Sequence, residues 1–117
     1  MRICLDLDGV ICELKKEWQD YGDVGVIQGA RESLKLLRES GHYIILHTAR
    51  HMKTTKSNVG LVNALQGFKT LKWLEDNGIE YDEIYFGKPW ADIYVDDNAL
   101  KFTSWAELMK GSEISEN

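Results

Sequence analysis

The chain has 117 residues, a formal net charge of −5, and 44% hydrophobic and 28% charged residues. This length matches the commonest size of a single domain, and the composition is that of an ordinary soluble protein with enough apolar residues for a core. No run approaches the ~20 consecutive apolar residues that cross a bilayer, which argues against a membrane protein. The acidic balance argues against a general nucleic-acid binder, because such proteins usually carry a basic face.

The first residues enter a strand pattern directly, without the charged, apolar and cleavage regions of a signal peptide, so we expect a cytoplasmic protein. The two cysteines, Cys4 and Cys12, are too few for a disulfide framework or a zinc site. We predict that Cys4 is a small core residue.

The first predicted element is a buried strand over residues 2–6, which ends in the run Asp6-Leu7-Asp8-Gly9. Two carboxylates at the mouth of a buried strand are costly to desolvate unless a positive group meets them. A parallel α/β sheet places its ligand site just outside the carboxyl ends of its strands. These residues therefore predict a cation site, a reacting site or both, and an Asp-Gly turn with a solvated second aspartate is the alternative.

Residues 10–28 follow as an irregular, mixed segment. Connections in compact domains are typically ~4–6 residues long, and much longer ones tend to be functional. We predict that this segment is a flap beside the site.

A helix is predicted over residues 30–40 by its apolar spacing, and a buried strand over 43–46 leads into His47-Thr48-Ala49-Arg50. Strand, helix and strand in this order imply a right-handed crossover and a parallel pair. Thr48 should therefore lie at the same edge of the sheet as Asp6.

The second half repeats the alternation of helix and strand. A polar loop at 50–66 is followed by a helix at 67–77, with Phe68, Leu71 and Leu74 on its inner face. The remaining predicted elements are a strand at 81–86, the break Gly87-Lys88-Pro89-Trp90, a buried strand at 91–95 ending in Asp96-Asp97-Asn98, a helix starting near Ser104, and a frayed tail at 112–117.

Polar groups thus follow four predicted strands and should converge on one edge of the sheet. They are the carboxylates of Asp6, Asp8, Asp96 and Asp97, the Thr48 hydroxyl and the Lys88 ammonium. Carboxylates this close repel each other, and a hard divalent cation with oxygen ligands, Mg²⁺, removes the conflict. A carboxylate can then attack a phosphoryl group, so the set suits phosphoryl transfer. His47 and His51 are not needed as ligands, since the carboxylates already supply a hard-ion site.

This series of residues resembles the four motifs of the haloacid dehalogenase superfamily over residues 2–98. The runs Thr48-Ala49-Arg50 and Gly87-Lys88-Pro89-Trp90 are also similar to small, nearly capless members linked to capsular or surface polysaccharide biosynthesis. The resemblance implies a three-layer α/β/α sandwich with a Rossmann-like parallel sheet, formed as one catalytic domain by residues 1–111.

By this resemblance, Asp6 is the nucleophile and a metal ligand. Asp8 is the general acid and base and binds the metal through its backbone carbonyl. Lys88 pairs with the phosphoryl group and with the nucleophile. Of the acidic pair, Asp97 is favoured for direct metal contact and Asp96 for orienting it or Lys88.

Thr48 also binds the phosphoryl group by this resemblance, and Ala49 and Arg50 belong to the same phosphate-binding run. The planar fork of Arg50 suits a second anion contact, and a structural or solvated arginine is the alternative. The acid at Asp8 favours phosphatase chemistry, because dehalogenase-type members lack it.

Without a separate cap domain, only residues 10–28 and 50–66 are available to cover the site. Either these loops select the substrate, or a neighbouring subunit of a homo-oligomer covers the opening, or the substrate is large. The sequence therefore predicts a Mg²⁺-dependent phosphomonoester hydrolase with an aspartyl-phosphate intermediate and a small phosphorylated metabolite as substrate, for which the subfamily resemblance suggests a sugar phosphate. The alternatives are a nucleotide or polynucleotide end phosphatase and a non-enzymatic receiver-like domain.

Overall fold

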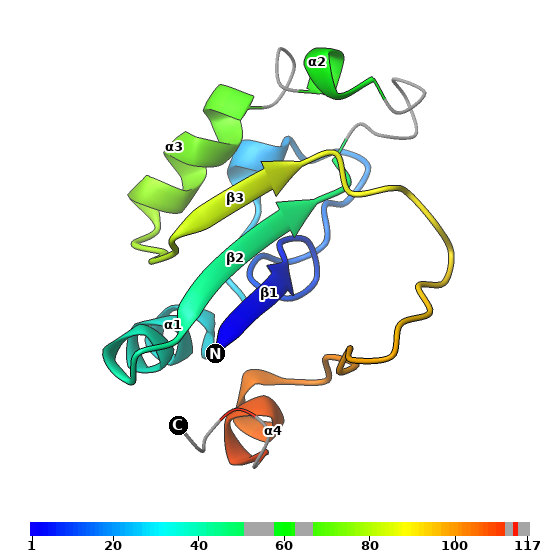
Figure 1. Ribbon diagram of the computed structural model, residues 1–117. Helices are drawn as coiled ribbons and strands as arrows, with labels where there is room; N and C mark the ends of the chain where they lie inside the picture. The colour runs from blue at the N-terminus through cyan, green and yellow to red at the C-terminus, as the bar shows by residue number, and fades with distance from the viewer. Residues whose placement is uncertain (51–57, 63–66, 112–113, 115–117) are drawn as a thin grey trace.

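The computed structural model describes residues 1–50, 58–62, 67–111 and 114, and its elements alternate between strand and helix (Figure 1). In chain order these are β1 (Arg2–Asp6), the 3₁₀ helix η1 (Tyr21–Asp23), α1 (Ala30–Glu39), β2 (Tyr43–Thr48), α2 (Val59–Val62), α3 (Phe68–Asp76), β3 (Glu83–Phe86) and α4 (Trp105–Lys110). Among the described residues, no helix is both long and apolar enough to cross a membrane.

The three strands form one parallel sheet in the order β1-β2-β3. Asp6 is paired with His47, and Thr48 is paired with Phe86. The carboxyl ends of the three strands therefore lie at the same end of the sheet. This is the parallel arrangement that the crossover through α1 predicts. The α/β class with a Rossmann-like sheet is therefore confirmed, and the described residues form no large cap.

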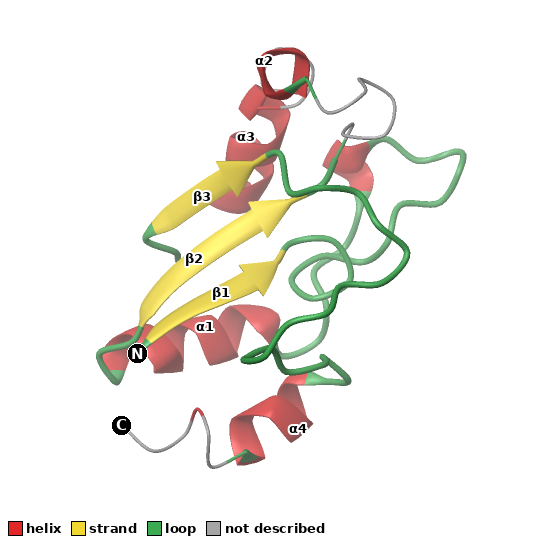
Figure 2. Ribbon diagram, turned by 45° about the vertical axis from the view of Figure 1, so that its right-hand side comes forward, coloured by secondary structure: helices red, strands yellow, loops and turns green. Residues whose placement is uncertain are grey.

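The core lies on one face of the sheet, where α1 and α3 both pack (Figure 2). Ile44 and Leu46 point into it from β2 and meet Leu34 of α1 and Leu74 of α3 in the same cluster. The other face carries Cys4, which is exposed, so its predicted place in the core is wrong. Successive side chains of a strand point to opposite faces of the sheet, so the face on which Cys4 lies depends on its position in β1 and not on its polarity.

The inner face of α3 differs from the predicted one. Phe68 and Leu71 are exposed, whereas Thr70, Trp73 and Leu74 are buried. Trp73 donates a hydrogen bond from Nε1 to the carbonyl of Val24, 2.9 Å away. The large indole ring and this tertiary contact rotate the helix away from the face that the leucine spacing suggests.

The segment at 10–28 is attached to the helices rather than standing free. Besides the Trp73 contact with Val24, Lys69 of α3 is paired with Asp20 at 3.1 Å. Trp105 of α4 donates from Nε1 to the carbonyl of Val10 at 2.8 Å. The segment is therefore held at both ends against the helical layer.

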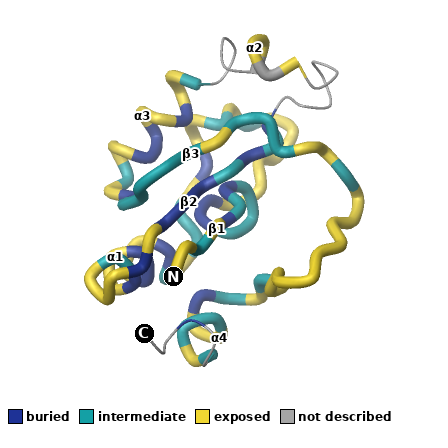
Figure 3. The backbone as a smooth tube through the Cα atoms, viewed as in Figure 1, coloured by how far each residue is buried: buried dark blue, intermediate teal, exposed yellow. Residues whose placement is uncertain are grey.

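The predicted strand at 91–95 is not formed. This part of the chain runs away from the sheet as an extended loop between β3 and α4, and it is mostly exposed (Figures 1 and 3). Ile93 and Val95 are 78% and 93% exposed. The Tyr94 hydroxyl donates to the Pro89 carbonyl and accepts from the Ala91 N–H, which closes a local turn in place of strand pairing.

Candidate active site

The candidate site begins in the turn that follows β1. Gly9 has a φ of 90°, a backbone conformation that side chains with a Cβ rarely adopt. The Gly9 N–H donates to the Cys12 carbonyl at 2.8 Å, and the Cys12 N–H donates to the Leu7 carbonyl at 3.1 Å. The Leu7 N–H donates to the His47 carbonyl at 2.9 Å, which fastens the turn to β2. The turn therefore holds Asp6 and Asp8 at the carboxyl end of the sheet.

Asp6 and Lys88 are brought together as the sequence predicts. Lys88 Nζ lies 3.3 Å from Asp6 Oδ2, with 14% of the lysine side chain and 34% of the aspartate side chain exposed. The Lys88 N–H donates to the Thr48 carbonyl at 3.0 Å, which fixes the lysine over the end of β2. Its ammonium also lies 4.1 Å from the centre of the Tyr94 ring. This leaves a partly exposed carboxylate beside a mostly buried cation.

Asp8 is held at both carboxylate oxygens. The Thr48 hydroxyl donates to Oδ2 at 2.8 Å, and Arg50 Nε donates to Oδ1 at 2.9 Å. Cys12 Sγ also lies 3.5 Å from Oδ1. Asp8 is thus the centre of a hydrogen-bond network that joins the turn after β1 to the end of β2.

The run Thr48-Ala49-Arg50 lies beside Asp8, but its side chains do not open toward a ligand. Thr48 is buried, and its hydroxyl accepts from the Arg50 N–H at 3.1 Å while it donates to Asp8. Arg50 is also buried and directs its guanidinium into the protein. The predicted direct contact of Arg50 with phosphate does not fit this placement, because Asp8 and its neighbours occupy the fork. Ala49 is half-buried between the two residues.

The acidic pair Asp96-Asp97 is exposed in the loop that follows Tyr94, away from the sheet. Asp96 Oδ1 accepts from the Asp97 N–H at 2.8 Å. Hydrogen bonding with the Asp97 side chain, and then with the backbone N–H groups of Asp97 and Asn98, lowers the pKa of Asp96. Within the described part of the chain, no group of three or more acidic, histidine or cysteine side chains is placed to hold a metal ion. The predicted four-carboxylate site is not assembled, because the strand that should carry Asp96 and Asp97 is not paired with β1.

His47 and Cys12, both near the site, have shifted pKa values. Burial lowers the pKa of His47, and the charge of Lys88 adds to this effect while Asp6 opposes it. Burial, with the neighbouring Asp8 charge, raises the pKa of the Cys12 thiol to about 12. Both shifts favour the uncharged side chain at neutral pH. His51 lies outside the described residues.

Sequence reasoning missed Cys12, Tyr21 and Thr70 as neighbours of Arg50. Cys12 and Tyr21 contact its guanidinium from the segment at 10–28, and Thr70 contacts it from α3. No spacing rule points to them, since the contacts depend on how α3 and η1 pack. The one usable signal was Arg50 itself, because an arginine directly after a buried strand needs partners if it is buried.

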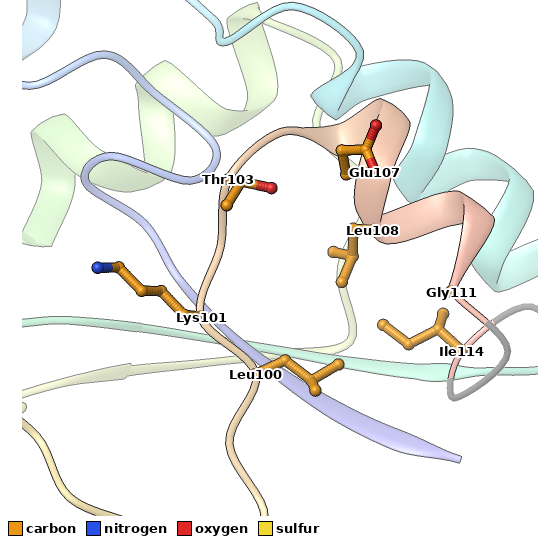
Figure 4. Close-up of a pocket in the computed structure, with 7 residues that line it drawn as sticks. All are labelled: Leu100, Lys101, Thr103, Glu107, Leu108, Gly111 and Ile114. Atoms are coloured by element: carbon orange, nitrogen blue, oxygen red, sulfur yellow. The ribbon is translucent and has the colours of Figure 1, made fainter.

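A pocket of about 170 Å³ lies elsewhere, between the loop before α4 and the residues after it (Figure 4). Leu100, Thr103, Leu108 and Ile114 are among its lining residues. None of the predicted site residues lines it, so it does not bear on the chemistry of Asp6 and Asp8.

Solved structures provide the comparisons with known proteins. A crystal structure of a target protein from Vibrio cholerae is 31% identical to this chain, with a TM-score of 0.83, and the match covers 98% of this chain and 94% of that one. No family model matches the chain, and no curated protein matches it.

Two other solved structures share the fold at lower identity. D,D-heptose 1,7-bisphosphate phosphatase from B. bronchiseptica, complexed with magnesium and phosphate, is 20% identical with a TM-score of 0.52, covering 78% of this chain and 51% of that one. A chain of the Pnkp1/Rnl/Hen1 complex is 21% identical with a TM-score of 0.53, covering 95% of this chain and 33% of that one.

The parallel sheet, with Asp6 at the end of β1 and Lys88 against it, defines an α/β protein that shares its fold with the heptose bisphosphate phosphatase. The chain belongs to the same family as the Vibrio cholerae protein.

Proposed function

We propose that the chain is a phosphomonoester hydrolase in which Asp6 attacks the phosphoryl group and Asp8 serves as general acid and base. The observation that carries this proposal is the Asp6–Lys88 pair at 3.3 Å, placed beside an Asp8 carboxylate that is held at both oxygens. The fold shared with a heptose bisphosphate phosphatase supports the same reaction class.

Asp6 is suited to be the nucleophile because its carboxylate is partly exposed at the end of β1. An anion that approaches a phosphoryl group is repelled, and at ~4 Å each like-charge pair costs roughly 4 kcal/mol at an effective dielectric of 20. The Lys88 ammonium offsets this repulsion from its position against Asp6. The product of attack is an aspartyl-phosphate, which water then hydrolyses.

Asp8 is suited to proton transfer because it lies two residues beyond the nucleophile and does not compete with it for Lys88. It gives a proton to the leaving oxygen in the first step and takes one from the attacking water in the second. Thr48 and Arg50 fix the direction in which the Asp8 carboxylate points.

Mg²⁺ fits the oxygen donors at this edge, since a carboxylate and a main-chain carbonyl are hard ligands and the ion keeps several waters. Asp6 through its carboxylate and Asp8 through its carbonyl would hold it. When bound, it would neutralise part of the negative charge around the phosphoryl group. The heptose bisphosphate phosphatase with the same fold was crystallised with magnesium and phosphate, which supports the assignment.

We further propose that Asp97, and Asp96 behind it, complete the metal site when residues 91–95 pair with the outer edge of β1. In the described part of the chain β1 has a strand on one side only, and unpaired edges readily accept another strand. Pairing would bury Ile93 and Val95, which are exposed.

Amide hydrogen exchange tests this pairing directly. Residues 91–95 and β1 should exchange more slowly in Mg²⁺ than in its absence, and Asp97→Asn should weaken that protection. Equal exchange with and without Mg²⁺ would mean that the acidic pair does not reach the site.

A small phosphorylated metabolite is the substrate class we propose, with a sugar phosphate as the first candidate. The heptose bisphosphate phosphatase that shares the fold supports this choice. A polynucleotide end phosphatase is the second candidate, supported by the fold shared with a chain of the Pnkp1/Rnl/Hen1 complex.

The test is phosphate release from sugar phosphates, nucleotides and a 3′-phosphorylated oligonucleotide in Mg²⁺, with wild type and Asp6→Asn. Turnover that the variant lacks supports the reaction class, and the preferred substrate separates the two candidates. Equal activity in wild type and Asp6→Asn would refute Asp6 as the nucleophile. A phospho-Asp6 that persists for hours would instead support a receiver-like role.

A further inference from the structure

Arg50 is the most densely connected side chain at the site. It lies two residues after Thr48 at the end of β2, and 1% of its side chain is exposed. Its three nitrogens donate to three different groups: Nε to Asp8 Oδ1 at 2.9 Å, Nη1 to Thr70 Oγ1 at 3.1 Å, and Nη2 to Cys12 Sγ at 3.3 Å. The Tyr21 ring covers the guanidinium, with its centre 4.2 Å from Cζ.

These contacts give the guanidinium one orientation. Its five N–H donors are fixed in a planar fork, so hydrogen bonds on three sides and a ring against its face determine where Nε points. Among the described residues, Asp8 is the carboxylate paired with this buried cation. Arg50 therefore fixes one oxygen of Asp8, and Thr48 fixes the other at 2.8 Å.

The same contacts turn the Arg50 guanidinium away from solvent. A side chain that is 1% exposed and directed toward Asp8, Thr70 and Cys12 offers little to a ligand at the mouth of the sheet. Lys88 is the cation that faces the nucleophile. The arginine is thus arranged to act on the acid, not on the substrate.

We infer that Arg50 is a positioning residue, which aims the Asp8 carboxylate at the leaving oxygen and is itself held in place by Thr70 of α3 and Tyr21 of η1. This inference rests on the proposed function, because it assigns Asp8 to proton transfer. It also gives the segment at 10–28 a role, since Tyr21 connects that segment to the reacting residues through Arg50.

Arg50→Met tests the inference because methionine fills similar space without donors. For an alkyl phosphate, which needs its leaving oxygen protonated, kcat should fall roughly 100-fold, as expected when a reacting group is misplaced by about 1 Å. KM should change little, since Arg50 does not contact the phosphate. An aryl phosphate with a good leaving group should lose much less.

The double variant Asp8→Asn/Arg50→Met separates positioning from a general structural effect. If Arg50 acts through Asp8, the double variant should be no slower than Asp8→Asn alone, whereas independent effects multiply. A further loss in the double variant would show that Arg50 acts apart from Asp8 and would overturn the inference.

Two milder variants keep the test available if Arg50→Met does not fold. Thr70→Val and Tyr21→Leu each remove one contact that holds Arg50 while leaving its charge paired with Asp8. Each should give a smaller loss with the same dependence on the leaving group. Equal losses on alkyl and aryl phosphates in both variants would contradict the inference.

Arg38→Met is the matched control. Arg38 is paired with Glu80 at 3.2 Å and Asp82 at 2.9 Å, near the amino-terminal end of β2 and away from the site. Arg38→Met should lower the stability of the fold, and any loss of kcat should be the same for alkyl and aryl phosphates. A raised KM with unchanged kcat in Arg50→Met would indicate that Arg50 binds the phosphate, and it would contradict the inference. An inactive wild type would refute the proposed function and this inference with it.

Discussion

Lys88→Met is the substitution whose effect can best be worked out from the structure. The ammonium lies 3.3 Å from Asp6 Oδ2, and a phosphoryl group on Asp6 would place its oxygens at a comparable distance. Two unit charges at this separation interact by about 5 kcal/mol at an effective dielectric of 20 and by about 1.3 kcal/mol in bulk water. Because 34% of the Asp6 side chain is exposed, screening favours an intermediate value of about 2–3 kcal/mol.

This energy predicts a loss of roughly 30- to 160-fold in kcat/KM, since each 1.36 kcal/mol corresponds to a factor of ten in rate. The assay is initial-rate phosphate release in Mg²⁺ from the best substrate of the panel. Lys88→Arg, which keeps the charge but changes the donor geometry, should lie between Lys88→Met and wild type.

The control for Lys88→Met is Lys72→Met. Lys72 is paired with Asp76 at 2.8 Å on the outside of α3, where both side chains are more than half exposed. Exposed ion pairs of this kind contribute little to stability, and this pair is not at the site. The kcat/KM of the control should therefore stay within about twofold of wild type. A Lys88→Met enzyme that also stays within this range would refute the electrostatic argument, as would an equal loss in Lys72→Met.

Three further predictions concern pH, thiol chemistry and metal. A hydrogen bond from the Ile44 N–H, together with the Arg38 pair, lowers the pKa of Asp82, so its contribution to stability is present above the usual carboxyl pKa of about 3.9 and is lost as pH falls below it. Urea midpoints should therefore separate wild type from Asp82→Asn at pH 7 and approach each other as the pH falls through the lowered pKa of Asp82; a constant difference would contradict this. Iodoacetamide at pH 8.5 should modify exposed Cys4 and leave buried Cys12 as a thiol, because the pKa of Cys12 is raised to about 12; equal labelling by mass spectrometry would count against the buried network. Chelating Mg²⁺ should stop phosphate release without reducing the helical circular dichroism signal, and a large loss of helix would instead indicate a structural ion.

Much of the framework follows from local patterns in the sequence. The strand predicted at 2–6 is β1, the helix at 30–40 is α1 with one residue fewer, and Ser104 caps α4 by accepting from the Glu107 N–H at 3.1 Å. Apolar spacing and capping residues act over a few neighbouring positions, so the sequence carries them directly. The order of strands and helices then places Asp6 and Lys88 at the same end of the sheet, because the carboxyl ends of parallel strands lie together.

The tertiary structure decided what those side chains touch. The sequence marks Arg50 as a cation after a buried strand, but only the packing of α3 and η1 directs it to Asp8, Thr70 and Cys12. Residues 91–95 show the same limit, since an apolar run indicates a tendency to be buried and does not specify the partner that covers it. Strand pairing and burial of a charge depend on groups that are distant along the chain, and a local pattern holds no information about their positions.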